Sequence, residues 1–166
     1  MKKSYLVCVL LSLFLIGCEK KAEITLDKLN ENNGVFFLEE SNKEYTGKVA
    51  EYYDNGELKY MAQLANGKYI GEAKEYYKNG QLQILDIYKD GLLNGESRHY
   101  YESGELLSKG TYINGKEEGE FYEYYENGNV RTMATYKTGI LNGIFRIYQD
   151  DGDLESEVIY KDGEVI

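Results

Sequence analysis

The residues that could do chemistry in this 166-residue chain are one histidine, two cysteines and 29 carboxylates. Nucleophilic catalysis of the Ser-His-Asp or Cys-His kind would have to use His99, and no neighbour in the sequence suggests a base or a nucleophile. Glu51, Glu75 and Glu123 recur at one position of a repeat, as solvated strand residues do, whereas paired catalytic acids are normally unique. No phosphate loop, HExxH or CxxC motif occurs. The sequence therefore predicts a protein that is not an enzyme.

The densest group of acids is Asp150-Asp151-Gly152-Asp153. Carboxylates this close together are conceivable Ca²⁺ ligands, but their spacing matches neither an EF-hand loop nor a nonapeptide calcium roll. Asp and Gly are also the residues that tight turns favour. We interpret this segment as a turn, and the sequence predicts no metal site and no cofactor.

Cys18 is the cysteine with a specific chemical expectation. Two lysines precede an apolar run from Tyr5 to Ile16, which has the length of a signal-peptide core and is short for a membrane span. The run ends in Leu15-Ile16-Gly17-Cys18, which resembles a bacterial lipobox. The resemblance implies that residues 1–17 are a signal peptide and that Cys18 receives a diacylglyceryl group. A plain secretory signal and an uncleaved N-terminal anchor are the alternatives.

Lipidation of Cys18 would place the protein at the bacterial cell envelope, held by acyl chains. Glu19 rather than Asp follows the cysteine, which favours export to an outer membrane if the cell has one. Cys8 would leave with the signal peptide, so no disulfide could form within the mature chain. The formal net charge of −10 disfavours binding to nucleic acid or to anionic lipid.

Eighteen tyrosines, 18 glycines and no proline are typical of a turn-rich β protein, and the glycines reveal a repeat. Fifteen of them form three columns with a period of 24 residues: Gly47, Gly71, Gly95, Gly119 and Gly143; Gly56, Gly80, Gly104, Gly128 and Gly152; Gly67, Gly91, Gly115, Gly139 and Gly163. The period divides residues 47–166 into five repeats, 47–70, 71–94, 95–118, 119–142 and 143–166.

Each repeat alternates strand-like runs with turn signals. Asn55-Gly56, Asn79-Gly80 and Asn127-Gly128 are predicted type I′ turns, and a second signal such as Asn66-Gly67 follows 11 residues later. Strand, turn, strand, turn in every repeat predicts an all-β fold, an elongated antiparallel meander of stacked β-hairpins. The glycines that begin the repeats, Gly47 and its equivalents, are expected at bulges or close backbone approaches.

Two tyrosine columns precede the first turn of each repeat. The first is Tyr52, Tyr76, Tyr100, Tyr124 and Tyr148, and the second is Tyr53, Tyr77, Tyr101 and Tyr125, followed by Gln149. Neighbouring residues point to opposite faces of a strand, so one column should join the apolar face while the other meets water. Both columns are expected to build cross-strand ladders. The second column is also our candidate binding strip, because it lapses at Gln149.

The residues before the first repeat divide into two parts. Residues 34–46 align with the second half of a repeat, and we expect Val35–Leu38 to be an N-terminal capping strand. Asn42-Lys43 falls where Asn66-Gly67 lies in the first repeat. Residues 18–33 lack the period and are predicted to be the lipidated cysteine followed by a polar tether.

The pattern G-x4-Y-Y-x-[NSD]-G-x-[LV]-x5-Y-x-[ND]-G resembles the bacterial variant of the MORN repeat over about 120 residues. The resemblance implies an elongated sheet of stacked hairpins and does not fix a function. MORN arrays bind partner proteins or were proposed to bind phospholipid, and the acidic charge of this array disfavours the lipid. Relatives of this type are often labelled antitoxins. We therefore expect a non-enzymatic lipoprotein whose sheet is a protein-binding scaffold at the envelope. The alternative is an antitoxin or immunity protein that neutralises a toxin. Self-association through open sheet edges is a further expectation.

Overall fold

The computed structural model describes residues 23–166, so the predicted signal peptide and Cys18 lie outside the described residues. The described part is nearly all β, with fifteen strands and one short 3₁₀ helix. None of its helices is long and apolar enough to cross a membrane. The predicted fold class is confirmed, because the strands form an antiparallel hairpin meander in an open sheet.

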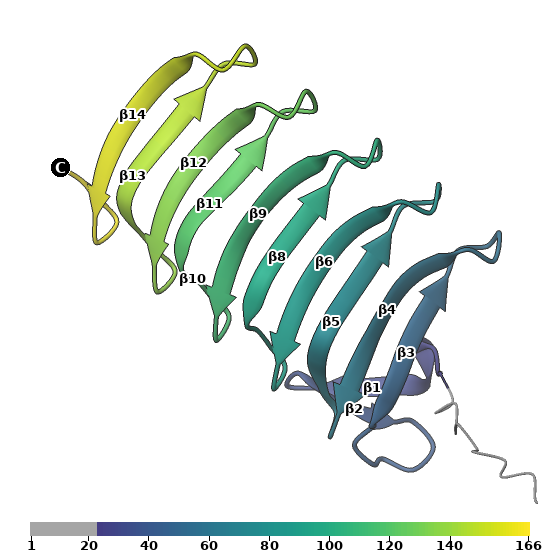
Figure 1. Cartoon of the computed structure of the whole chain (residues 1–166). Helices are drawn as coiled ribbons and strands as arrows, with labels where there is room; N and C mark the ends of the chain where they lie inside the picture. The colour runs from purple at the N-terminus through teal and green to yellow at the C-terminus, as the bar shows by residue number, and fades with distance from the viewer. Residues whose placement is uncertain (1–22) are drawn as a thin grey trace, which may run out of the picture.

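The main sheet has 13 strands and runs through all five repeats in a single layer (Figure 1). Its long strands are β3 (Gly47–Tyr52), β4 (Leu58–Ala65), β5 (Lys68–Tyr76), β6 (Leu82–Lys89), β8 (Gly95–Tyr100), β9 (Leu106–Ile113), β11 (Gly119–Tyr124), β12 (Val130–Lys137), β13 (Ile140–Tyr148) and β14 (Leu154–Lys161). The short strands β7 (Leu92–Leu93), β10 (Lys116–Glu117) and β15 (Glu164–Val165) extend the hairpins at β6, β9 and β14.

Two kinds of tight turn alternate along the meander. At the second turn of each repeat both central residues have positive φ, as at Asn66 (49°) and Gly67 (72°), which is the type I′ geometry. At the first turn only the glycine has positive φ, for example 85° at Gly56. The Gly56 N–H donates to the carbonyl of Tyr53 over 2.8 Å, and the Tyr53 N–H donates to the carbonyl of Glu57 over 2.8 Å. This is a type I turn that ends in a left-handed glycine.

The prediction of type I′ turns at Asn55-Gly56, Asn79-Gly80 and Asn127-Gly128 is therefore wrong, and the asparagine side chain supplies the reason. Oδ1 of Asn55 accepts a hydrogen bond of 3.0 Å from the Glu57 N–H. The same bond recurs from Gln81 to Asn79, from Asn129 to Asn127 and from Asp153 to Asp151. At these turns Asn and Asp therefore accept hydrogen bonds through their side chains, and they do not adopt a left-handed backbone conformation.

The N-terminal segment folds differently from the expectation. β1 (Leu29–Asn32) and β2 (Val35–Leu38) form a separate two-stranded sheet, so the predicted capping strand exists but does not extend the main sheet. The predicted polar tether is folded from Ile24 onward: Ile24 bridges to Val49 at the edge of β3, and η1 (Leu26–Lys28) follows. This segment contains apolar side chains among its polar ones, and the 24-residue pattern does not reveal them. These side chains explain why the segment folds instead of forming a tether.

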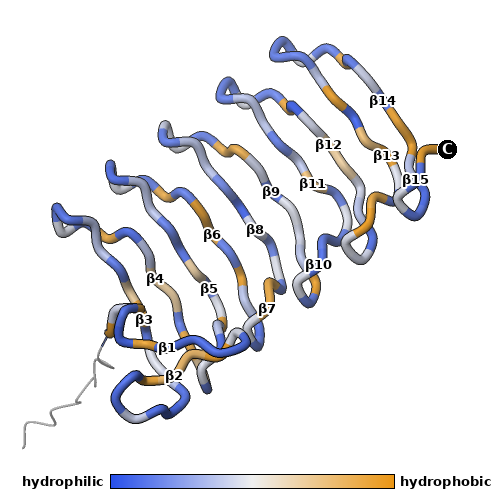
Figure 2. Tube along the Cα trace, turned by 180° about the vertical axis from the view of Figure 1, so that it is seen from behind, coloured by the Kyte–Doolittle hydropathy of each residue, from blue (hydrophilic) through white to orange (hydrophobic). Residues whose placement is uncertain are grey.

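The core lies between this hairpin and the first repeats. Val49 and Leu64 are fully buried, and Ile24, Leu26, Leu29, Phe36 and Leu38 pack against them and their neighbours. Figure 2 shows β1 and β2 lying across the first strands of the main sheet, while the later strands remain a single layer. The face that the hairpin covers therefore continues, uncovered by any described element, into the later repeats.

Candidate functional site

We call the face that carries the β1–β2 hairpin the hairpin face. Beneath the hairpin it is formed by Val49, Ala62, Leu64 and Ala73. Equivalent positions 24 residues apart continue it along the array as Ser97, Phe121 and Phe145, and as Asp86, Gly110, Ala134 and Val158. These residues are cross-strand partners in the sheet, so they share one face.

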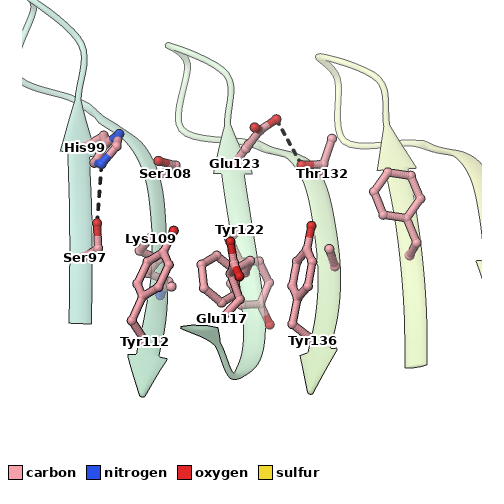
Figure 3. A pocket seen from close by; sticks show the side chains of 14 residues that line it. Ser97, His99, Ser108, Lys109, Tyr112, Glu117, Tyr122, Glu123, Thr132 and Tyr136 are labelled. Carbon is pink, nitrogen blue, oxygen red and sulfur yellow. Dashed lines mark hydrogen bonds between the residues drawn. The ribbon is translucent and has the colours of Figure 1, made fainter. Parts of the chain in front are cut away.

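Beyond the hairpin, the hairpin face holds an open groove of about 490 Å³ that is lined by residues from β8 to β13 (Figure 3). Two rows of side chains cross the strands in this groove. The aromatic row is Tyr112, Phe121, Tyr136 and Phe145, and the polar row is Ser97, His99, Ser108, Glu123 and Thr132. Glu117 lies beside the aromatic row (Figure 3).

The aromatic row is held by edge-to-face ring contacts. The ring centroids of Tyr112 and Phe121 are 5.3 Å apart at 89°, and those of Phe121 and Tyr136 are 5.1 Å apart at 74°. Gly110 makes room for the central ring, because a Cβ there would overlap the Phe121 side chain. The rings are half-buried, so the row offers apolar area to a ligand while it stabilises the sheet.

The polar row supplies donors and acceptors rather than a catalytic set. Oγ of Ser97 lies 3.4 Å from Nε2 of His99, and Oγ1 of Thr132 donates to Oε2 of Glu123 over 3.1 Å. Within residues 23–166 no acid is hydrogen-bonded to His99, so the Ser-His pair lacks the third group that orients a general base. No group of three metal-binding side chains occurs in the same part of the chain.

Two carboxylates, Glu117 and Glu123, and one ammonium, that of Lys109, line the groove. Burial raises the pKa of Tyr112, and the carboxylates of Glu117 and Asp86 add to that shift. Burial likewise raises the pKa of Tyr136, with Glu117 and Glu123 contributing. Among the described residues no lysine or arginine lies within ion-pair distance of Glu117 or Glu123. A cationic group entering the groove would therefore meet carboxylates that have no cationic partner.

The candidate binding strip lies beside the first turns rather than in the groove, and its tyrosine hydroxyls are already hydrogen-bonded. Each of its four tyrosines donates to a backbone carbonyl one repeat along: Tyr53 to Tyr76 (2.6 Å), Tyr77 to Tyr100 (2.7 Å), Tyr101 to Tyr124 (2.7 Å) and Tyr125 to Tyr148 (2.8 Å). The rings are half-buried between adjacent repeats. The column therefore has a structural role, and its use as a contact strip stays a prediction.

The first tyrosine column lies on the face opposite the hairpin, among charged side chains. The hydroxyl of Tyr76 lies 3.9 Å from Sδ of Met61, and the Lys109 ammonium lies 6.0 Å from the ring centre of Tyr124. The first column therefore does not build the hairpin face. The rings of that face come from Tyr112, Tyr136 and their equivalents.

The sequence located neither the groove nor its central ring. His99, considered from the sequence only as a catalytic candidate, lines the groove. Phe121 and Phe145 stand in a column whose other members are Val49, Ala73 and Ser97. One signal could have located the groove. It is a large residue in a column of small ones, next to Gly110 in the neighbouring column.

Comparison with known proteins agrees with the fold. The MORN repeat variant family matches residues 45–66, 69–90, 93–114, 117–138 and 141–162, which is more than half of the chain. No curated protein matches the sequence. A solved structure, the GtfA/B complex bound to UDP and GlcNAc, is 15% identical with a TM-score of 0.27, and the match covers 81% of this chain and 24% of that one. A TM-score this low supports no inference about function. The family match indicates a repeat module and no catalytic family, and the chain belongs to the MORN repeat variant family.

Proposed function

We propose that this protein is a non-enzymatic lipoprotein whose repeat sheet binds another protein at the bacterial cell envelope. The observation that carries the proposal is the open groove on the hairpin face, where half-buried rings and unpaired carboxylates lie side by side. Partly exposed aromatic side chains in a concave site are the usual anchors of protein recognition. A repeat array adds a long, rigid surface on which such a site is held.

Attachment to the membrane is the second part of the proposal. The Leu15-Ile16-Gly17-Cys18 sequence supports lipidation of Cys18, with export to an outer membrane if the cell has one. A short spacer would then join the lipid to the folded segment that begins at Ile24. Metabolic labelling with a radioactive fatty acid tests this directly: wild type should carry the label and Cys18→Ala should not.

Partner binding is tested by crosslinking in the native cells, followed by purification of the full-length lipoprotein and mass spectrometry. We expect one stoichiometric protein partner that is recovered with wild type and with Cys18→Ser at reduced yield, because the anchor concentrates the protein at the membrane. Recovery of no protein would overturn the proposal. A small toxin as the partner would favour the antitoxin or immunity function instead of the scaffold.

A further inference from the structure

We propose that the groove takes an extended segment of a partner protein, lying across the strands, that presents a bulky apolar side chain flanked by lysine or arginine. This inference rests on the proposed protein-binding function and names the surface and the chemistry of the partner.

The chain itself shows how an extended segment lies on this face. In β2 the ring of Phe36 is placed 5.2 Å from the ring of Tyr69 at 67°, and the Tyr69 ring lies 5.2 Å from that of Tyr88. The Phe36 N–H donates to the carbonyl of Gly67 over 2.8 Å. A ring from an extended strand thus packs on the tyrosines of the sheet, while its backbone bonds to the turn below.

The groove offers the same kind of surface without such a segment. Tyr112 and Tyr136 are the equivalents of Tyr88 in the next two repeats, and the ring of Phe121 from the sheet itself packs between them. Glu117 stands two repeats on from Tyr69, the residue that receives Phe36, so the groove offers a carboxylate beside the rings. The groove is continuous with the face that the hairpin occupies, yet no described element covers it. We therefore infer an occupant of the same kind, supplied by another protein.

Charge and polarity define the rest of the occupant. Glu117 and Glu123 have no cationic partner within residues 23–166, and the chain carries a net charge of −10, so a basic segment is attracted and an acidic one is repelled. An extended backbone brings N–H and C=O groups that need partners. Ser97, His99 and Thr132 can supply them. A volume of about 490 Å³ suits the side chains of a short segment rather than a folded domain.

The test uses random linear peptides displayed on phage and selected against the full-length lipoprotein in detergent. Counter-selection uses the charge-reversal variant Glu117→Lys/Glu123→Lys. We expect enrichment of peptides that combine an aromatic or large aliphatic residue with lysine or arginine. The most enriched peptide is then synthesised with a fluorescent label, and its affinity is measured by anisotropy. The charge reversal should weaken binding on the order of tenfold or more.

Two further variants keep the result interpretable. Glu102→Lys/Glu126→Lys changes the net charge by the same amount at exposed turn residues and should bind like wild type. Phe121→Leu keeps an apolar side chain at the centre of the aromatic row, so the fold should survive while binding falls several-fold. Circular dichroism of every variant reports folding independently of binding.

Three outcomes would overturn the inference: selected peptides without basic residues, equal affinity for the groove and control variants, or binding of oligosaccharides rather than peptides to the groove on a glycan array. The proposed function has a separate failure. If a protein partner is crosslinked in cells but is lost equally from groove and control variants, the scaffold function stands and the groove assignment falls. If no protein is crosslinked, the scaffold function itself falls.

Discussion

The phenolic hydroxyl of Tyr101 donates a hydrogen bond of 2.7 Å to the carbonyl oxygen of Tyr124, one repeat further along the array. Four such bonds link the five repeats, in addition to the strand ladder. The stability of a repeat array is approximately a sum of repeat and nearest-neighbour terms, and these bonds belong to the second kind. In the fifth repeat Gln149 stands in the same column.

Tyr101→Phe is therefore predicted to destabilise the array. The substitution keeps the ring and removes one bond to a backbone carbonyl, which should lower the free energy of unfolding by about 1 kcal/mol. Urea denaturation measures the change. Tyr52→Phe is the matched control, because Tyr52 is 52% exposed and should lose its hydroxyl without effect. Equal midpoints for Tyr101→Phe and wild type would show that these bonds contribute nothing.

Thr138→Asn is predicted to stabilise the protein. Thr138 is a β-branched residue with φ of 54° at a position that is Asn or Asp in the other repeats, such as Asn66 with φ of 49°. Left-handed backbone costs a β-branched residue roughly 1–2 kcal/mol, and Asn tolerates it better. We expect a gain of about 1 kcal/mol in thermal or urea unfolding. The reverse change, Asn66→Thr, should lower stability, and a gain from it would contradict the explanation.

Gly110→Ala is predicted to disturb the aromatic row, because the added Cβ would overlap the Phe121 ring. Overpacking of this kind costs about 1–3 kcal/mol. Chemical denaturation of Gly110→Ala, of Phe121→Ala and of the double variant forms a thermodynamic cycle. The double variant should be more stable than the sum of the single changes implies, since the ring that collides is gone. Additive effects would mean that the ring does not depend on Gly110.

The sequence was sufficient for the fold because the glycine columns record backbone geometry directly. Left-handed residues such as Gly56 and Gly67 recur wherever the chain must turn, so their period locates every hairpin. The type of the first turn was missed because Asn-Gly fits both a type I′ turn and a turn in which Asn acts as an acceptor.

The covering hairpin and the groove could not be derived in the same way. Packing of Phe36 on Tyr69 joins residues without a shared periodic position, and it depends on where a non-repeating segment folds back. The face of the sheet toward which each tyrosine column points could not be predicted either. The reason is that β-bulges shift the register between Glu51 and Tyr52 and at the equivalent places. A bulge breaks simple alternation of faces.

Alkaline pH is predicted to destabilise the protein partly through Tyr122. The Tyr122 hydroxyl donates to Oε2 of Glu120 over 2.6 Å, and this bond is the main reason that its pKa is raised to about 12. An unfolded tyrosine titrates near pH 10. The folded state therefore holds the proton more tightly, and the contribution of Tyr122 is complete below about pH 10 and is lost as the pH rises to about 12.

Tyr122→Phe isolates this contribution from the other tyrosines whose pKa is raised, such as Tyr112 and Tyr136. The free energy of unfolding should fall less steeply between about pH 10 and about 12 in Tyr122→Phe than in wild type, because one titrating group is missing. Glu120→Gln should act in the same direction, since it keeps a hydrogen-bond acceptor but removes the negative charge that opposes ionisation. Urea midpoints measured at closely spaced pH values give the slopes. Parallel slopes for wild type and both variants would show that the Tyr122–Glu120 bond does not hold the proton in solution.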